Sequence, residues 1–271
     1  MPELPEVETI RRVLLPYLKN AVIESARVDD AAIAYPSPAR FVGLVEGQRI
    51  KDMERRGKFL RFVLENGVMT LHLRMTGCLT LVPQGTPDPP HLRAAFFLSS
   101  GRRLNFEDVR RFGRLWFTPA GEADVSGAEK LGIEPFDGAL TVEFLAEKCK
   151  NRKRTVKQLL LDQSVIAGIG NIYSDEILFS AGIRPDRTCA SLEREELARL
   201  AAAIPERLEY FVEKNALDLK EHNAGKGREY RNTPFLQVYG RGGEKCVKCA
   251  EKLQRIVICG RSSIFCPHCQ K

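Results

Sequence analysis

Two pairs of cysteines near the carboxyl end place the strongest constraint on how this chain folds. Cys246 and Cys249 form the first pair, Cys266 and Cys269 form the second, and 16 residues separate the pairs. A spacer of two residues lets both thiolates of a pair face one tetrahedral ion at about 2.3 Å, as in structural zinc sites. Disulfides or free thiols are the alternative, but disulfides are rare inside cells and zinc supplies folding free energy to short segments. The spacing therefore predicts one structural Zn²⁺ ion with four cysteine ligands.

The residues between the cysteine pairs predict a β-hairpin. Residues 255–259 and 262–266 are strand-like, and Gly260 with Arg261 forms the turn between them. Such a hairpin closed by two zinc knuckles is a zinc ribbon. We expect His268 to be exposed, because four thiolates already complete the metal shell. Arg261 near the tip is either solvated or a contact to phosphate.

Basic charge is concentrated in the same part of the chain. Residues 220–271 contain 11 basic and four acidic residues, which accounts for the whole net charge of +7. A cationic segment on a neutral body favours a polyanion such as nucleic acid as the partner, although an ordinary basic enzyme can have the same composition. Zinc ribbons also serve as protein-interaction modules, so the ribbon alone does not identify an enzyme.

The remainder of the 271 residues is long enough for two or three compact units. Residues 5–18 have the spacing of an amphipathic helix, and residues 22–117 form short alternating runs typical of an antiparallel β-sandwich. A glycine-rich turn then precedes a helix that Asn171 is well placed to cap. The expected helices of this second region span residues 142–150, 155–162, 172–181 and 192–215, the last interrupted near Pro205.

The chain shows no sign of a membrane segment. No apolar run approaches the roughly 20 residues that span a bilayer. The first residues carry acids where a signal peptide would carry bases. We therefore expect a cytoplasmic protein with no membrane partner.

The amino terminus offers a second candidate site. Pro5 and the acids around it are ordinary chemistry for the start of a helix, and this is the simplest interpretation of the segment. A small penultimate Pro2, however, favours removal of Met1. The resulting secondary amine, with a pKa of about 8 for α-amino groups in general, can act as a nucleophile, and Glu3 beside it can donate or accept a proton.

Several sequence blocks together indicate a known family. They are MPELPEVE at residues 1–8, GK at 57–58, HLRMTG at 72–77, DVRRFG at 108–113, GIGNIY at 168–173, QVYGR at 237–241 and the four-cysteine ribbon. In this order they resemble bacterial formamidopyrimidine-DNA glycosylase from the first residue to the last. The resemblance implies an α+β multidomain fold: an antiparallel β-sandwich with flanking helices at 1–135, a helix-two-turns-helix domain at 136–222, a lesion-reading loop at 223–236 and a zinc ribbon at 237–271.

The resemblance also implies a reaction. It implies that Pro2 attacks C1′ of a damaged nucleotide, displaces the oxidised purine and forms an iminium that promotes β- and δ-elimination at the abasic site. Glu3 would move protons at the sugar and Lys58 would contact phosphate, which makes these three the catalytic residues. Glu6 would support the first turn of the helix. The implied partner is double-stranded DNA that contains oxidised bases or abasic sites, bound by a monomer.

The same resemblance assigns DNA contacts. A nucleotide that is flipped out of the duplex leaves a gap, which Met75, Arg110 and Phe112 would fill. The sequence alone favours a different place for Met75, because it continues the apolar face of the preceding strand and reads as a core residue. His72 and Lys226 are more simply explained as solvated side chains. The complete set of implied DNA-binding residues is His72, Met75, Arg110, Phe112, Asn171, Lys226 and Arg261.

Two rival interpretations remain open at this stage, one of the same class and one of a different class. A relative of the endonuclease-eight type would prefer oxidised pyrimidines, but Leu4 stands where such relatives typically have glycine. A catalytically silent zinc-ribbon protein that binds DNA is disfavoured because Pro2, Glu3 and Lys58 are all present. The stretch 223–235 departs from the family pattern and carries Pro234, which puts the base preference in doubt more than the chemistry.

Overall fold

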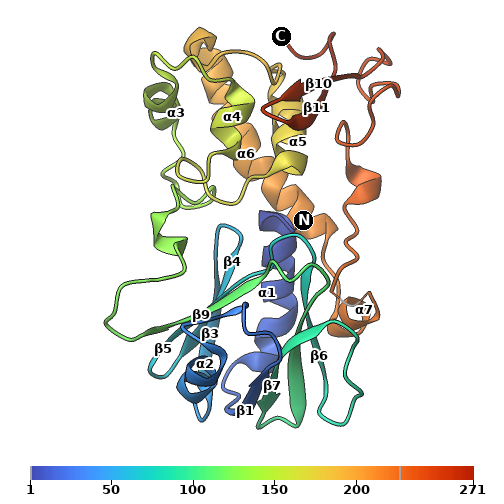
Figure 1. Ribbon diagram of the computed structural model, residues 1–271. Helices are drawn as coiled ribbons and strands as arrows, with labels where there is room; N and C mark the ends of the chain where they lie inside the picture. The colour runs from blue at the N-terminus through green and yellow to red at the C-terminus, as the bar shows by residue number, and fades with distance from the viewer. Residues whose placement is uncertain (1, 226) are drawn as a thin grey trace. The chain divides into compact units, whose positions relative to one another are not determined.

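The computed structural model describes residues 2–225 and 227–271, and they form two compact units (Figure 1). One unit comprises Pro2, residues 6–129 and residues 215–230. The other comprises residues 3–5, 130–214 and 231–271. The structure thus groups the predicted zinc ribbon with the helices, whereas the four-segment division drawn from the sequence stays a prediction.

The first unit is a sandwich of two β-sheets. One sheet has the strand order β1-β7-β8-β6, and all its pairings are antiparallel. The other has the order β2-β9-β5-β4-β3, in which only the short β2 runs parallel to its neighbour. The strands are β1 (Ile23–Val28), β2 (Ala34–Tyr35), β3 (Ile50–Arg56), β4 (Phe59–Leu64), β5 (Gly67–His72), β6 (Gly77–Pro83), β7 (Leu92–Leu98), β8 (Arg102–Asp108) and β9 (Arg114–Pro119).

One buried cluster joins both sheets to the first helix. Alternating residues of the strands point inward because successive side chains of a strand face opposite sides of the sheet. Helix α1 (Leu4–Leu18) adds Val7, Ile10 and Leu14, which lie on one side of the helix and are fully buried in the same cluster. Helix α2 (Pro38–Val45) contributes Phe41 and Val45. The predicted helix and β-sandwich are therefore confirmed.

The second unit is built on helices around a core of its own. Its helices are α3 (Val142–Cys149), α4 (Val156–Leu161), α5 (Asn171–Ala181) and α6 (Arg194–Lys214). The predicted break near Pro205 is wrong, because α6 continues through this proline. Proline removes one backbone hydrogen bond, but buried Leu200, Ile204 and Leu208 on the apolar face of α6 hold the helix against the core.

The ribbon is a two-stranded hairpin with a small cluster of its own. Strands β10 (Gln254–Ile258) and β11 (Arg261–Phe265) pair in antiparallel register, with Ile258 opposite Arg261. Leu253, Ile264 and the buried cysteines pack beside Phe179 of α5 and Val238. None of the helices in the described part of the chain combines the length and the hydropathy that a membrane span requires.

Candidate functional site

The carboxylate of Glu3 occupies the amino-terminal end of helix α5. It accepts hydrogen bonds from the backbone N–H groups of Gly170 (2.8 Å), Ile172 (3.0 Å) and Tyr173 (3.3 Å). The first N–H groups of a helix have no partner within the helix and carry partial positive charge, so a carboxylate is well suited to this position. Glu3 is 2% exposed, and these bonds fix the residue that follows Pro2 in the chain.

The glycines of the turn before α5 allow this close approach. A Cβ atom on Gly170 would lie 2.3 Å from the carboxyl carbon of Glu3, and one on Gly168 would lie 2.5 Å from the Leu4 side chain. Gly168 also has φ +91°, a backbone conformation that other residues rarely adopt. Its carbonyl accepts the N–H of Leu4 at 3.1 Å. Glycine is therefore required at both positions to seat residues 3–5.

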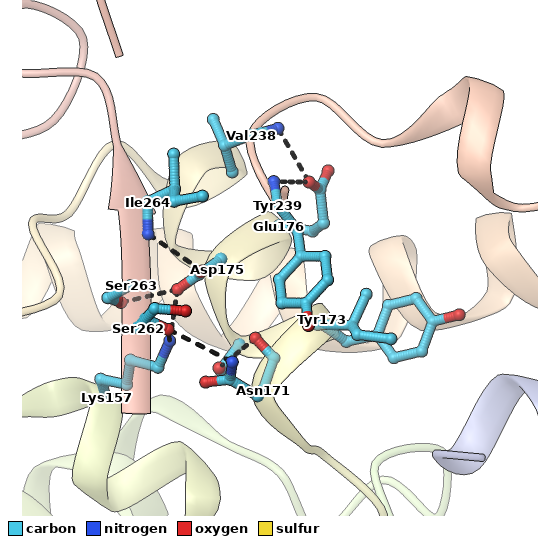
Figure 2. A network of polar contacts seen from close by, with 12 residues as sticks. Lys157, Asn171, Tyr173, Asp175, Glu176, Val238, Tyr239, Ser262, Ser263 and Ile264 are labelled. Carbon is cyan, nitrogen blue, oxygen red and sulfur yellow. Dashed lines mark hydrogen bonds and ion pairs between the residues drawn. The ribbon is translucent and has the colours of Figure 1, made fainter. Parts of the chain in front are cut away.

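Asn171 has a different role from the one that the sequence predicts. The predicted helix cap is wrong, because Gly170 is the cap residue and Glu3 satisfies the free N–H groups. Asn171 is the first residue of α5, and its side-chain amide donates to the carbonyl of Ser262 at 3.2 Å (Figure 2). Asn171 and the tip of the ribbon hairpin are therefore neighbours.

A buried ion pair connects α4, α5 and the ribbon. Lys157 Nζ lies 2.6 Å from Asp175 Oδ1, and both side chains are almost completely buried. The same carboxylate accepts the hydroxyl of Ser263 at 2.7 Å and the N–H of Ile264 at 3.0 Å, while Lys157 also donates to the carbonyl of Ser262 at 3.3 Å (Figure 2). Burial raises the pKa of Asp175 and lowers that of Lys157, and the ion pair opposes both shifts. The pair thus ties β11 to the helices.

The next residue of α5 holds the segment that leads to the ribbon. The carboxylate of Glu176 accepts N–H groups from Gln237 (3.0 Å), Val238 (2.9 Å) and Tyr239 (2.9 Å), as Figure 2 shows in part. Sequence reasoning missed both Asp175 and Glu176. The available signal was two adjacent acids in an otherwise apolar helix, since buried acids are almost always paired or hydrogen-bonded.

Arg261 is exposed at the start of β11. The neighbouring Ser262 is the residue that contacts Asn171 and Lys157. The charge of Arg261 lowers the pKa of Lys157, after the larger effect of burial, so the two cations lie within electrostatic range of each other. This end of the helical unit therefore combines the exposed charge of Arg261 with the side-chain amide of Asn171. Lys157 is buried against Asp175, and Glu3 occupies the amino-terminal end of α5.

Met75, Arg110 and Phe112 gather at the surface of the sheet unit. The guanidinium of Arg110 lies over the Phe112 ring at 4.6 Å and contacts the Met75 sulfur at 3.1 Å. Met75 is 44% exposed and Phe112 is 45% exposed. The prediction of a core position for Met75 from the strand pattern is wrong, because β5 ends at His72 and Met75 lies in the turn beyond it.

Asp108 organises the turn that carries this cluster. It is fully buried, its carboxylate accepts the hydroxyl of Thr76, and it also accepts the N–H groups of Gly113 (2.7 Å) and Arg110 (3.2 Å). The two turns that follow β5 and β8 are thereby joined. These hydrogen bonds of Asp108 support the turns from which Met75, Arg110 and Phe112 are exposed.

The structure places the other predicted catalytic residues inside the sheet unit. Pro2 is buried, and Lys58 is 9% exposed in the turn before β4. Glu6 is 2% exposed, and Asn215 donates to its carboxylate at 3.4 Å. Glu6 therefore connects the first turn of α1 to the segment that follows α6.

His72 is a buried residue, and its predicted solvation is wrong. It is 8% exposed, its ring meets the Phe59 ring edge-on at 4.5 Å, and Nδ1 accepts the N–H of Arg74 at 2.9 Å. Burial, and then the charges of Arg74 and Lys58, lower the pKa of His72 to about 3. The ring is therefore neutral at physiological pH.

This buried histidine should make the sheet unit less stable in acid. Its pKa falls from 6.5 to about 3 on folding, so between these values protons bind the unfolded chain preferentially and stability falls as the pH falls. The expected loss at pH 5 relative to neutral pH is about 2 kcal/mol. Urea unfolding followed by the fluorescence of Trp116, the single tryptophan, measures it.

The matched variants separate His72 from other titrating groups. His72→Asn keeps an acceptor for the Arg74 N–H and should reduce the loss between neutral pH and pH 5. His91→Asn changes a histidine in the loop before β7 and should leave the loss unchanged. An equal acid dependence in all three proteins would contradict the assignment.

Short helices lie at the start of and within the loop implied to read the lesion, residues 223–236. Helix α7 (Leu219–Ala224) is capped by Asp218, and its His222 ring bonds the Leu79 carbonyl at 2.7 Å. Arg228 pairs with Glu107 at 3.1 Å. A short 3₁₀ turn, Thr233–Phe235, follows at Pro234. Lys226 lies outside the described residues.

The four predicted zinc ligands come together. The sulfur atoms of Cys246, Cys249, Cys266 and Cys269 all lie within 4.8 Å of one another. The Cys249 and Cys266 sulfurs are 3.5 Å apart, and those of Cys246 and Cys269 are 3.9 Å apart. Four thiolates at tetrahedral zinc are separated by about 3.8 Å, so the residues fit the ion. The zinc site is confirmed.

The other polar residues of the ribbon stand outside this cluster. His268 is exposed, as predicted, and so is Cys259. Backbone N–H groups of Lys248 and Cys269 point at ligand sulfurs, each at 3.4 Å. Such N–H contacts orient and stabilise metal-bound thiolates.

A β-sandwich, a pair of helices joined by glycine-rich turns and a four-cysteine ribbon define a class of zinc-containing DNA glycosylases. Family models match all three regions: the formamidopyrimidine-DNA glycosylase N-terminal domain at residues 1–115, the H2TH domain of the same family at 131–221, and the zinc finger found in FPG and IleRS at 243–271. The chain belongs to the formamidopyrimidine-DNA glycosylase family.

Individual relatives agree over the full length. The formamidopyrimidine-DNA glycosylase of Moorella thermoacetica is 44% identical over 259 residues, or 94% of each chain, and that of Geobacillus kaustophilus is 40% identical over all of both chains. A solved complex of Lactococcus lactis Fpg with DNA containing an abasic site is similar over 99% of both chains, with 29% identity and a TM-score of 0.89. Another complex of the same protein holds DNA containing Fapy-dG, also with a TM-score of 0.89.

Proposed function

We propose that this glycosylase excises oxidised purines, namely 8-oxoguanine and formamidopyrimidines, from duplex DNA and nicks the strand through a Schiff base at Pro2. The observation that carries the proposal is the fixed position of Glu3. Three N–H groups hold the carboxylate that directly follows the nucleophile. The Fapy-dG complex of the Lactococcus lactis relative supports the substrate class.

The proposed chemistry needs a free amine at Pro2 after Met1 is removed. The amine nitrogen forms a bond to C1′, the glycosidic bond breaks, and the base leaves with a proton. Opening of the sugar ring gives an iminium, which is cationic without protonation because the amine is secondary. This cation acidifies the C2′ proton, and its removal expels the 3′ phosphate. A second elimination expels the 5′ phosphate, and hydrolysis of the iminium releases the enzyme.

Other residues have proposed roles in binding the DNA. Lys58 and Arg261 supply positive charge for phosphate, and Asn171, which contacts the residue after Arg261, adds a side-chain amide suited to a phosphate oxygen. The exposed cluster of Met75, Arg110 and Phe112 is suited to fill the gap that a flipped nucleotide leaves, because it combines apolar area with hydrogen-bond donors. Buried His72 supports the adjacent turn.

Borohydride trapping tests the proposed function. Reduction in the presence of a duplex that contains 8-oxoguanine should yield a covalent protein–DNA adduct, because only reduction of an iminium leaves a stable C–N bond between the protein and the sugar. Peptide mapping should place the adduct on Pro2. A protein that binds the lesion duplex but yields no adduct would be a silent DNA-binding protein. An adduct only with oxidised pyrimidines would reassign the substrate.

Arg110 should set a preference for the base opposite the lesion. Its guanidinium can donate to N3 and O2 of an orphaned cytosine, whereas adenine offers N1 and a competing amino donor. Loss of a good bidentate base contact costs about 1–3 kcal/mol, or roughly 5- to 150-fold. Single-turnover excision of 8-oxoguanine should therefore be faster opposite cytosine than opposite adenine.

A neighbouring arginine provides the matched control. Arg110→Ala should shrink the preference for cytosine while the borohydride adduct still forms. Arg111→Ala should keep the preference, because the Arg111 guanidinium pairs with Asp30 and is committed to the protein. The same preference in wild type and Arg110→Ala would assign discrimination to other residues.

A further inference from the structure

Cys149 and Cys189 form a pair of thiols that the glycosylase reaction does not use. Cys149 ends helix α3, and Cys189 lies 40 positions later in a short 3₁₀ turn, Cys189–Ser191. Both side chains lie in the same buried cluster and line one pocket. Both are free and lie far from the zinc ligands in the sequence. Two neighbouring free thiols can form a disulfide when an oxidant is supplied.

Backbone hydrogen bonds connect the segments that follow Cys149 and carry Cys189, and the Cys149 carbonyl itself accepts the N–H of Arg152 at 3.1 Å. Residues 152–156 run antiparallel to residues 187–190, with Cys189 N–H bonded to the Arg154 carbonyl at 2.9 Å and Ala190 N–H bonded to the Arg152 carbonyl at 3.2 Å. Thr155 and Thr188 form the bridge between these segments. The pair is therefore a fixed feature of the fold.

A pocket gives small molecules access to the thiols. Its volume is about 530 Å³, and its lining includes Cys149, Cys189, Lys150 and Asn151. The two cysteines are otherwise buried, at 3% and 1% exposure. Such a buried position disfavours large reagents such as another protein's thiols, and the pocket is the side from which a small reagent would approach.

The two thiols differ in acidity. The hydrogen bond from Cys149 and then the charge of Arg154 lower the pKa of Cys189, against the effect of burial. The pKa of Cys149 is raised, first by its hydrogen bond to Cys189 and then by burial. A thiolate is the reactive form of cysteine, so Cys189 is suited to attack and Cys149 to resolve.

We propose that Cys149 and Cys189 are a reactive dithiol site that small hydroperoxides oxidise to an intrachain disulfide. The Cys189 thiolate attacks one peroxide oxygen, the O–O bond breaks, and a sulfenic acid forms while the other oxygen leaves as water or alcohol. The Cys149 sulfur then attacks the sulfenic sulfur, its proton goes to the departing hydroxyl, and water leaves as the S–S bond forms. The thiols lose two electrons, and the peroxide gains them.

Disulfide mapping on the zinc-loaded full-length protein tests this site. The protein is treated with hydrogen peroxide, its remaining thiols are alkylated under denaturing conditions, and peptides are analysed without reduction. We expect a cross-linked peptide pair containing Cys149 and Cys189, lost on treatment with dithiothreitol, before a colorimetric chelator detects released zinc. Oxidation confined to zinc ligands, or both thiols recovered as separate alkylated peptides, would overturn the proposal.

Single variants identify the attacking sulfur and control for misfolding. In Cys149→Ala, Cys189 should accumulate as a sulfenic acid that dimedone labels, whereas Cys189→Ala should leave Cys149 unlabelled. Labelling of Cys149 alone would contradict the proposed order. Cys78 is the internal control within the same protein, since burial raises its pKa to about 12 and it should remain unoxidised. Because the cross-link is measured in the wild-type protein, it tests disulfide formation between Cys149 and Cys189 even where a variant folds poorly.

Discussion

A protein that retains Met1 should yield no borohydride adduct and should neither excise the lesion nor nick the strand. Any residue before Pro2 converts its amine into an amide, whose nitrogen has no nucleophilic lone pair. Lesion binding should largely persist, because the proposed phosphate contacts and the Met75, Arg110 and Phe112 cluster are untouched. Mass spectrometry defines the amino terminus, and single-turnover excision measures the loss.

A cleavable extension supplies the control for this experiment. The extended protein should be inactive, and proteolysis that leaves Pro2 as the first residue should restore the adduct in the same sample. If a verified Met1-retaining protein forms the adduct at the normal rate, the nucleophile is another amine and Pro2 is excluded.

Loss of the zinc ion should unfold the ribbon and loosen the helical unit while the β-sandwich stays folded. Structural zinc contributes on the order of 10 kcal/mol to such segments. The ribbon also supplies Ser263 and Ile264 as hydrogen-bond partners of the buried Asp175 carboxylate. Without them the buried carboxylate keeps Lys157 but loses two hydrogen bonds, and a buried polar group that loses its partner costs about 1–3 kcal/mol.

Cys249→Ser and chelation should have the same effect by separate routes. DNA binding should weaken, and circular dichroism should report loss of helix stability, while fluorescence of Trp116 in β9 should still show a folded sandwich. Cys259→Ser is the matched control, because this exposed cysteine lies outside the metal cluster. Purified protein without zinc by elemental analysis, yet with a folded ribbon, would contradict this account.

Patterns that are local in the sequence predicted much of the fold. The zinc ligands depend on two short spacers, the hairpin on the strands between them, and the first helix on a single apolar stripe, so each follows from neighbouring residues. The strand pattern failed at Met75, where one turn ended the alternation. It also failed to predict that His72 is buried, because the burial of a strand residue depends on the side chains that pack over it, here Phe59.

By itself, the sequence determined the metal, the ribbon, the class of each region and the family resemblance. Only the tertiary structure decided that Glu3 caps α5 across 167 to 170 positions of the chain, and that Asp175 is buried against Lys157 and β11. The physical reason is that a carboxylate is stabilised by whichever donors surround it. Those donors come from segments that folding brings together and that no spacing along the chain records.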